Sequence, residues 1–244
     1  MWKSIFYQVL LVVLMGFEVA VGTINIGTGA IGTNFSITGK TPATGTWKAV
    51  KLTWSGRSET TDTSGEQDIQ PGIGFAVSST SRRAITGQSD HGVNPSATNN
   101  YHHDAAVVVV LDTTGAVVGL LDFVSFNADG ATFVVDDAFP AALEVSYMLV
   151  GGTDLTNAEI GQFQLAIATG DSDYTGLTTF QPDFALFAST ARTSAPPSGG
   201  TTMQLSIGAA TASSQAALAI NSFNAAATSV TGSYCRMEEM FASL

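Results

Sequence analysis

The run His102-His103-Asp104 is the densest group of side chains that could do chemistry, with Tyr101 just before it and His91 upstream. Imidazole and carboxylate groups bind metal ions and transfer protons. Adjacent residues of a strand point to opposite faces, however, so His102 and His103 cannot readily hold one ion. We interpret these five residues as candidates for surface contact. A metal-dependent or pH-responsive contact is the less favoured alternative, and catalysis the least.

Acidic pairs offer a second chemistry. Asp171 and Asp173, with Asp136 and Asp137, could supply oxygen ligands to calcium. An EF-hand needs several more oxygens and a distal Glu, so the Asp-x-Asp spacing alone indicates little. Turn formation by Asp and Ser explains these residues better. We therefore predict no metal site and no cofactor.

Nucleophile and phosphate-loop motifs are missing from the sequence. There is no Gly-x-Ser-x-Gly, and the Gly-rich segment 27–34 lacks a following Lys or helical pattern. The sequence therefore predicts no catalytic or cofactor-binding residue and no enzyme. Trp47, Trp54 and Tyr101 could stack on a sugar ring. Trp54 alternates with apolar positions, which favours core packing instead.

The charge balance excludes one class of partner. The chain has 244 residues and a net charge of −11, with 9 Lys and Arg against 20 Asp and Glu. It lacks the basic field that binding to a phosphate backbone needs, so nucleic acid is not expected. The single cysteine, Cys235, cannot form an internal disulfide, and we interpret it as a small half-buried hydrophobic residue.

The N-terminal segment has two interpretations. Residues 1–22 carry an early cation, Lys3, and an apolar run at 9–14, as a secretory signal does. The run is too short to span a bilayer stably. Met15 offers a second start, and we expect residues 1–14 to be a leader or a misassigned start outside the packed fold. Cleavage after Gly22 would instead make the protein secreted.

The remaining pattern is that of short strands. Segments rich in Val, Ile, Phe and Thr are separated by Gly, Asn, Asp and Pro, which predicts an all-β sandwich. Residues 49–54 alternate between apolar and polar, whereas 105–112 are apolar and are expected to form a central strand covered on both faces. An Asp-Gly turn is predicted within 127–130. Segments 58–68 and 193–202 are predicted to be exposed loops.

The sequence also repeats itself. Residues 47–57 match 182–192, with their final arginines 135 positions apart, and 72–85 match 205–220, with Ile85 aligned to Ile220. We predict two tandem, jelly-roll-like β-sandwich units related by internal duplication, at 15–152 and 153–244, joined by a linker so short that the units pack together.

The second unit is predicted to be incomplete. Residues 240–244 match 122–126, so the second unit has no counterpart of 127–152 and lacks two or three strands. Either the reading frame is truncated or another subunit donates the strands. The first strand, 21–26, aligns with 160–165, and this favours a start at Met15 over cleavage after Gly22.

The repeated segments, with GFEVAVG (16–22), VSFNADG (124–130) and VSYMLVGGTDLTNAEIGQF (145–163), resemble a family of duplicated β proteins among the virion structural proteins of tailed bacteriophages, many of them marine. The resemblance covers nearly the whole chain and rests on spacing and punctuation. It implies a noncatalytic particle component of the tail, fibre or capsid surface, located in the virion. The implied partners are copies of itself, other virion subunits and a host-surface glycan.

A secreted bacterial adhesin or carbohydrate-binding module is the alternative, motivated by the apolar leader and the Thr- and Ser-rich composition. Neighbouring genes distinguish the two: terminase, portal or tail genes favour the virion, whereas a secretion or sugar-utilisation locus favours the alternative.

Overall fold

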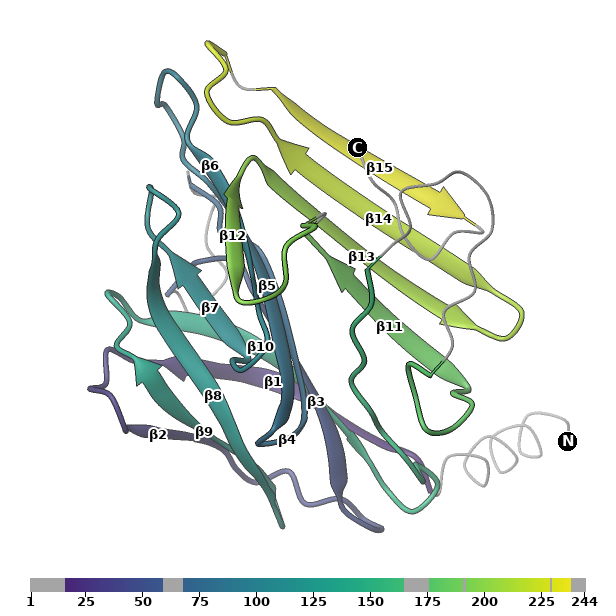
Figure 1. Ribbon diagram of the computed structural model, residues 1–244. Coiled ribbons are helices and arrows are strands. Elements are labelled where there is room, and N and C mark those ends of the chain that lie inside the picture. Colours follow the sequence, from purple (N-terminus) through teal and green to yellow (C-terminus); the bar gives the residue numbers. More distant parts are fainter. Residues whose placement is uncertain (1–15, 59–67, 165–175, 191, 229, 238–244) are drawn as a thin grey trace, which may run out of the picture.

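The computed structural model describes residues 16–58, 68–164, 176–190, 192–228 and 230–237. These residues form three antiparallel sheets, with no helix among them, so the predicted all-β class is confirmed (Figure 1). Within this part of the chain there is also no helix long and apolar enough to cross a membrane.

The largest sheet, here called the central sheet, has seven strands. In spatial order they are β1 (Glu18–Ile26), β10 (Leu143–Gly151), β3 (Trp47–Trp54), β4 (Gly72–Ser78), β5 (Ser81–Ser89), β6 (Thr98–His103) and β12 (Ser198–Thr201). The β7 sheet has the order β2 (Asn34–Ile37), β9 (Gly130–Asp137), β8 (Val117–Asn127) and β7 (Val108–Leu111). The β13 sheet has the order β11 (Phe184–Ser189), β13 (Met203–Thr211), β14 (Gln215–Ser222) and β15 (Thr231–Met237).

The main core lies between the central sheet and the β7 sheet. Strand β3 buries Val50, Leu52 and Trp54, whereas Lys51 and Thr53 between them stay half-exposed, as the alternation predicts. Early strands pair with late ones: β1 pairs with β10 along its whole length, and β2 pairs with β9. This nested pairing closes a β-sandwich, as predicted.

The β13 sheet packs on the opposite face of the central sheet and makes a third layer (Figure 1). Leu205 of β13 packs against Ile73 and Ile85 of β4 and β5. The Thr98 hydroxyl also donates a hydrogen bond to the Ser222 carbonyl oxygen at 2.8 Å. The predicted packing between the two parts of the chain is therefore confirmed for the described residues.

The two ladders β3-β4-β5-β6 and β11-β13-β14-β15 have the same strand order. Their cross-strand pairs also correspond: Leu52–Gly74 with Phe187–Gly208, and Thr86–Tyr101 with Ala219–Tyr234. This agreement accords with the duplication, which stays a prediction. One detail of the alignment is wrong. In the first ladder Ile85 lies opposite Ile73, and in the second ladder Leu218 lies opposite the corresponding Ile207. Ile85 therefore corresponds to Leu218 and not to Ile220, because a β-bulge and a different hairpin turn shift the second alignment.

The second ladder is a single sheet in the described residues, not a sandwich of its own. Residues 160–164 form no strand, although they align with part of β1. Strand β1 is held by its pairing with β10, and no strand in the described second half occupies the place of β10. Residues 198–201 were expected in a loop but form β12, which pairs with the otherwise free edge of β6.

Strand β7 differs from its prediction in position. It lies at the edge of its sheet, not at the centre. Val108 and Val109 are nevertheless fully buried, because β7 also lies against β4, β5 and β6 of the central sheet. The predicted hairpin of β8 and β9 is confirmed, but its turn residues are Ala128 and Asp129, with Asn127 opposite Gly130.

Some sequence predictions fall outside the described residues. They concern the start at 1–14, the acidic pair Asp171 and Asp173, most of loop 58–68, and the match of 240–244 to 122–126.

Candidate functional site

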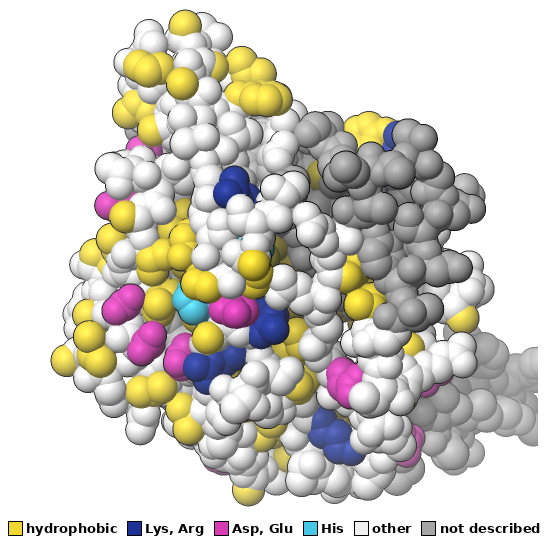
Figure 2. Space-filling model, in the orientation of Figure 1, with side chains coloured by type: hydrophobic (Ala, Val, Ile, Leu, Met, Phe, Trp, Pro, Cys, Tyr) yellow, Lys and Arg dark blue, Asp and Glu magenta, His cyan; other side chains and the backbone are white. Residues whose placement is uncertain are grey.

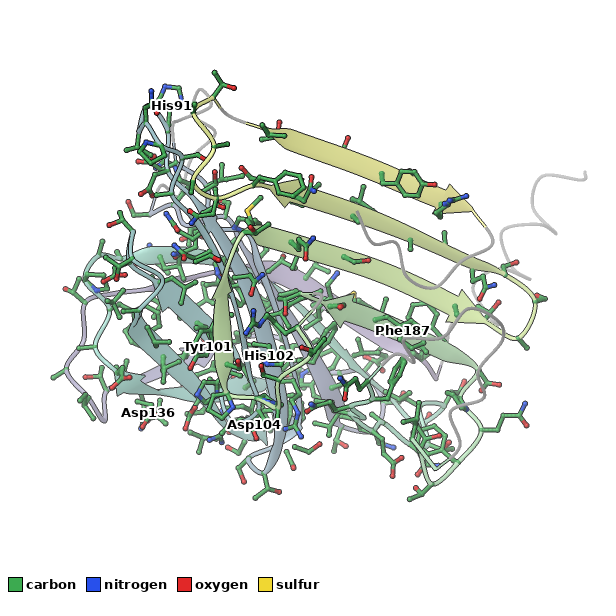
Figure 3. All side chains as sticks on the ribbon, turned by 45° about the horizontal axis from the view of Figure 1, so that its top comes forward. His91, Tyr101, His102, Asp104, Asp136 and Phe187 are labelled. Carbon is green, nitrogen blue, oxygen red and sulfur yellow. The ribbon has the colours of Figure 1, made fainter. Side chains whose placement is uncertain are left out.

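Strand β6 places three of the five candidate residues. The rings of Tyr101 and His103 stack with their centroids 6.3 Å apart, and His102 points to the other face, beside Ser198 of β12 (Figure 3). The expectation that the two histidines point apart is thus met. Asp104 follows the strand and interacts electrostatically with all three side chains.

His91 does not join this group. It lies in the loop after β5, where its backbone N–H donates to Asp68 Oδ1 at 2.5 Å. Figure 3 shows it at the opposite end of β6 from His102 and Asp104. The sequence places five candidates within 14 positions, but an extended strand separates them in space.

The two histidines have different surroundings but the same direction of pKa shift. Burial lowers the pKa of His102, and the charge of Arg192 lowers it further, against the opposing effect of Asp104. Burial also lowers the pKa of His103, against the carboxylates of Asp104 and Asp136. The Ala105 N–H donates to His103 Nδ1 at 3.0 Å, so the proton of the neutral ring lies on Nε2. Burial therefore favours the neutral form of both rings.

Several alternative sites are not formed. In the described residues no three His, Cys, Asp or Glu side chains are placed to hold a metal ion. Trp47 and Trp54 are only 4% and 5% exposed, so they cannot stack on a sugar, and the core interpretation of Trp54 is confirmed. Cys235 is exposed, not half-buried, and it lies opposite Leu218, which is also exposed.

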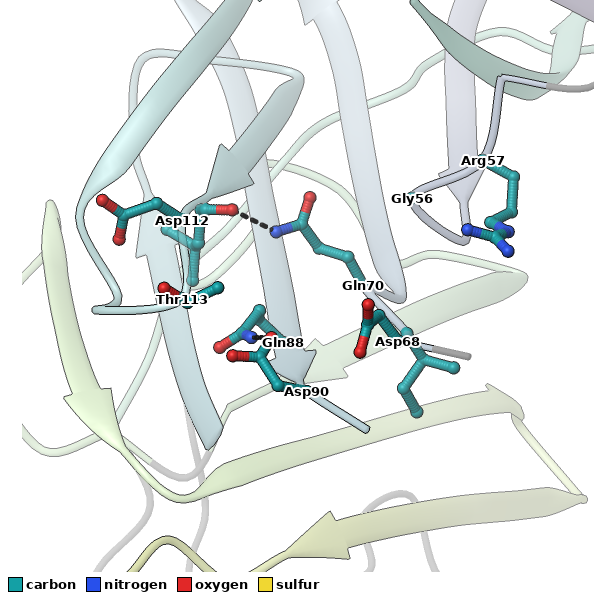
Figure 4. Close-up of a pocket in the computed structure, with 10 residues that line it drawn as sticks. Gly56, Arg57, Asp68, Gln70, Gln88, Asp90, Asp112 and Thr113 are labelled. Atoms are coloured by element: carbon teal, nitrogen blue, oxygen red, sulfur yellow. Dashed lines mark hydrogen bonds between the residues drawn. The ribbon is translucent and has the colours of Figure 1, made fainter. Parts of the chain in front are cut away.

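A cavity of about 310 Å³ lies at one end of the sandwich and was missed by sequence reasoning (Figure 4). Its lining residues are Gly56, Arg57, Asp68, Ile69, Gln70, Gln88, Asp90, Leu111, Asp112 and Thr113. Gln70 Nε2 donates to the Leu111 carbonyl oxygen at 2.7 Å, and Gln88 donates to Asp90. These residues come from four separate segments, and no motif in the sequence links them.

The charged side chains that line the cavity are mainly acidic. Burial raises the pKa of Asp90, and the nearby charges of Asp68 and Asp112 raise it further. Hydrogen bonds from Thr114 and Ala116 lower the pKa of Asp112, which caps a turn. Carboxylates and amides around a cavity of this size can hydrogen-bond a hydroxylated ligand such as a sugar.

Charged side chains of both signs and a histidine gather among apolar ones on the face seen in Figure 2. This face therefore carries no single-sign field. Comparison with protein-family models, with curated proteins and with solved structures finds no match for this chain.

Proposed function

We propose that the protein is a noncatalytic structural subunit of a tailed-phage particle, located in the tail, fibre or capsid surface, and that it works as a homo-oligomer with other virion subunits. The observation that carries the proposal is an apolar face left exposed on the β13 sheet. The resemblance to duplicated virion proteins supplies the kind of particle.

The exposed face continues a buried one. Ile207 packs against the cluster of Ile73, Ile85 and Leu205, and Leu218 lies directly opposite Ile207 on the same face. Leu218 is nevertheless 48% exposed, and Phe184 on the same face is 56% exposed. Large side chains that extend a packed apolar cluster into water favour a contact with another molecule.

The edge of the same sheet points to the same conclusion. Strand β3 of the first ladder pairs on both sides, with β10 and with β4. Its counterpart β11 pairs only with β13 among the described strands. An unpaired edge presents backbone N–H and C=O groups to a neighbour, and this is how one subunit can extend another's sheet. We therefore expect a second copy of the chain at β11 and the adjoining face.

The first prediction concerns assembly. Replacing Leu218 with lysine is expected to weaken self-association by about 10- to 100-fold, because about 1.5–3 kcal/mol of leucine burial is lost. Light scattering over a range of concentrations measures it. Val21→Lys is the control, since Val21 is 65% exposed on β1, in a different sheet. A wild-type chain that is monomeric at all concentrations, or equal effects of both variants, would contradict an interface at the β13 sheet.

Placement in a virion is tested separately. Antibodies against the protein are expected to label purified phage particles from its natural source, at a regular position seen by electron microscopy. Particles that lack the protein would rule out the virion even if the chain is an oligomer.

The cavity, with its carboxylate and amide side chains, favours the second candidate, a secreted adhesin or carbohydrate-binding module. Its test is calorimetric titration with neutral oligosaccharides, comparing the wild type with Gln70→Ala. Sugar binding that the variant loses would favour this candidate, most strongly when neighbouring genes encode secretion or sugar use. A virion subunit that contacts a host glycan would also bind the sugar, but its gene would lie next to terminase, portal or tail genes.

A further inference from the structure

Three basic side chains lie on the face of the central sheet that also carries the β13 sheet. Arg83 of β5 lies on the same face as Ile85, and Ile85 is directly opposite His102 of β6. His102 is in turn opposite Ser198 of β12. Arg192 comes from the segment between β11 and β12, and its charge acts on His102. The pairing of β12 with β6 thus brings together residues that are far apart in the sequence.

The position of Arg192 depends on a glycine. A Cβ atom on Gly200 would come within 1.9 Å of Arg192 Nη1, so the guanidinium lies directly over this residue. Gly200 is opposite Asn100, and Arg192 Nη2 lies 3.5 Å from the Ser198 hydroxyl. The guanidinium is therefore beside both Asn100 and His102.

Each of the three basic side chains has a buried nitrogen without a hydrogen-bond partner. These atoms are Arg83 Nε, His102 Nε2 and Arg192 Nε. Arg83 uses its Nη1 on the carbonyl oxygens of Arg82 and Asp104, which leaves Nε unpaired. A buried donor without a partner costs free energy, so an acceptor group that reached these nitrogens would be favoured.

One acceptor accompanies these donors. Asn100 is only 3% exposed, its Nδ2 donates to the Thr202 carbonyl oxygen at 2.7 Å, and its Oδ1 is buried without a partner. The bond from Nδ2 fixes which end of the amide is the oxygen. The site thus offers several donors and one acceptor to a ligand.

We propose that Arg83, His102, Arg192 and Asn100 form a binding site for a phosphate group. Donors from three residues match the oxygens of a tetrahedral anion, and an arginine guanidinium is well suited to phosphate. A carboxylate has only two oxygens. Inorganic phosphate near pH 7 also carries a P–OH that can donate to Asn100 Oδ1, and sulfate has none.

Phosphate binding should also change the pKa of His102. A bound anion favours the imidazolium and raises its pKa, as Asp104 does, against burial and the charges of Arg192 and His103. This shift gives a readout that depends on the site itself.

The test is a titration of the full chain with inorganic phosphate. Calorimetry measures the binding, and the NMR signals of His102 measure its pKa with and without phosphate. We expect Arg192→Gln to weaken phosphate binding at least 10-fold. Arg236→Gln removes the same charge from an arginine that stacks on Tyr234 of β15, and it should bind like the wild type. Sulfate and acetate are expected to bind more weakly than phosphate.

Gly200→Ala provides a second variant, because its methyl group displaces the guanidinium without removing a charge. It should weaken phosphate binding as Arg192→Gln does. Thermal melting shows whether each variant folds. If neither variant folds, His102→Gln is the variant that tests the site. The proposal is overturned when the folded site variants bind phosphate like the wild type, when sulfate or acetate binds as tightly, or when phosphate leaves the pKa of His102 unchanged.

Discussion

Replacing Phe133 with alanine is expected to lower the free energy of unfolding by about 4 kcal/mol. Phe133 lies on β9 between the two sheets of the sandwich, is 0% exposed, and packs edge-on against Phe123 with the ring centroids 5.8 Å apart. Alanine removes most of the buried ring and leaves a cavity that close-packed neighbours cannot fill. Chemical denaturation measures the loss.

The control for this variant is Val124→Ala. Val124 lies on β8, next to Phe123, but its side chain is exposed. Its replacement should change the free energy of unfolding by no more than about 0.5 kcal/mol. If the free energy of unfolding of Phe133→Ala lies within about 1 kcal/mol of the wild-type value, the two sheets do not share a core at Phe133.

Replacing Arg82 with methionine is expected to cost about 2 kcal/mol. Arg82 Nη2 pairs with Asp122 Oδ2 at 2.6 Å and joins β5 to β8 across the sandwich. Methionine leaves this carboxylate without its partner. The expected loss is smaller than for a fully buried pair, because the two side chains keep 15% and 18% exposure to water.

The same ion pair predicts a pH dependence. Burial raises the pKa of Asp122 to about 6, in spite of the attraction of Arg82, and the charge of Asp136 adds to the increase. The folded state therefore binds this proton more tightly than the unfolded state, so the contribution of Asp122 to stability falls as the pH rises from about 4 to about 6. In Arg82→Met the pKa should be higher still, and the fall should extend above pH 6.

Asp122→Asn should remove this component of the fall. The double variant Arg82→Met/Asp122→Asn should recover part of the stability lost in Arg82→Met, since no carboxylate is left unpaired. Denaturation curves at pH 4, 6 and 8 measure both effects. An unchanged pH profile in Asp122→Asn would show that another group titrates in this range.

Local patterns in the sequence were sufficient to determine the class of fold and many burial preferences. The alternation at 49–54 predicts which side chains of β3 enter the core, and the apolar run at 105–112 predicts that Val108 and Val109 are buried. The hairpin of β8 and β9 follows from the turn-forming segment 127–130, although the turn itself is Ala128-Asp129 and not the predicted Asp-Gly pair. These features depend on neighbours along the chain, because the strand period of two determines which faces meet water.

Tertiary structure alone decided which strands are partners. The sequence did not show that β12 joins β6, that β7 lies at an edge, or that residues 160–164 lack a strand. It therefore could not place Arg192 beside His102 or assemble the cavity. A strand's apolar face specifies what it must bury but not which backbone edge it pairs with. That choice depends on loop closure and on which edges remain free after the rest of the sheet has formed.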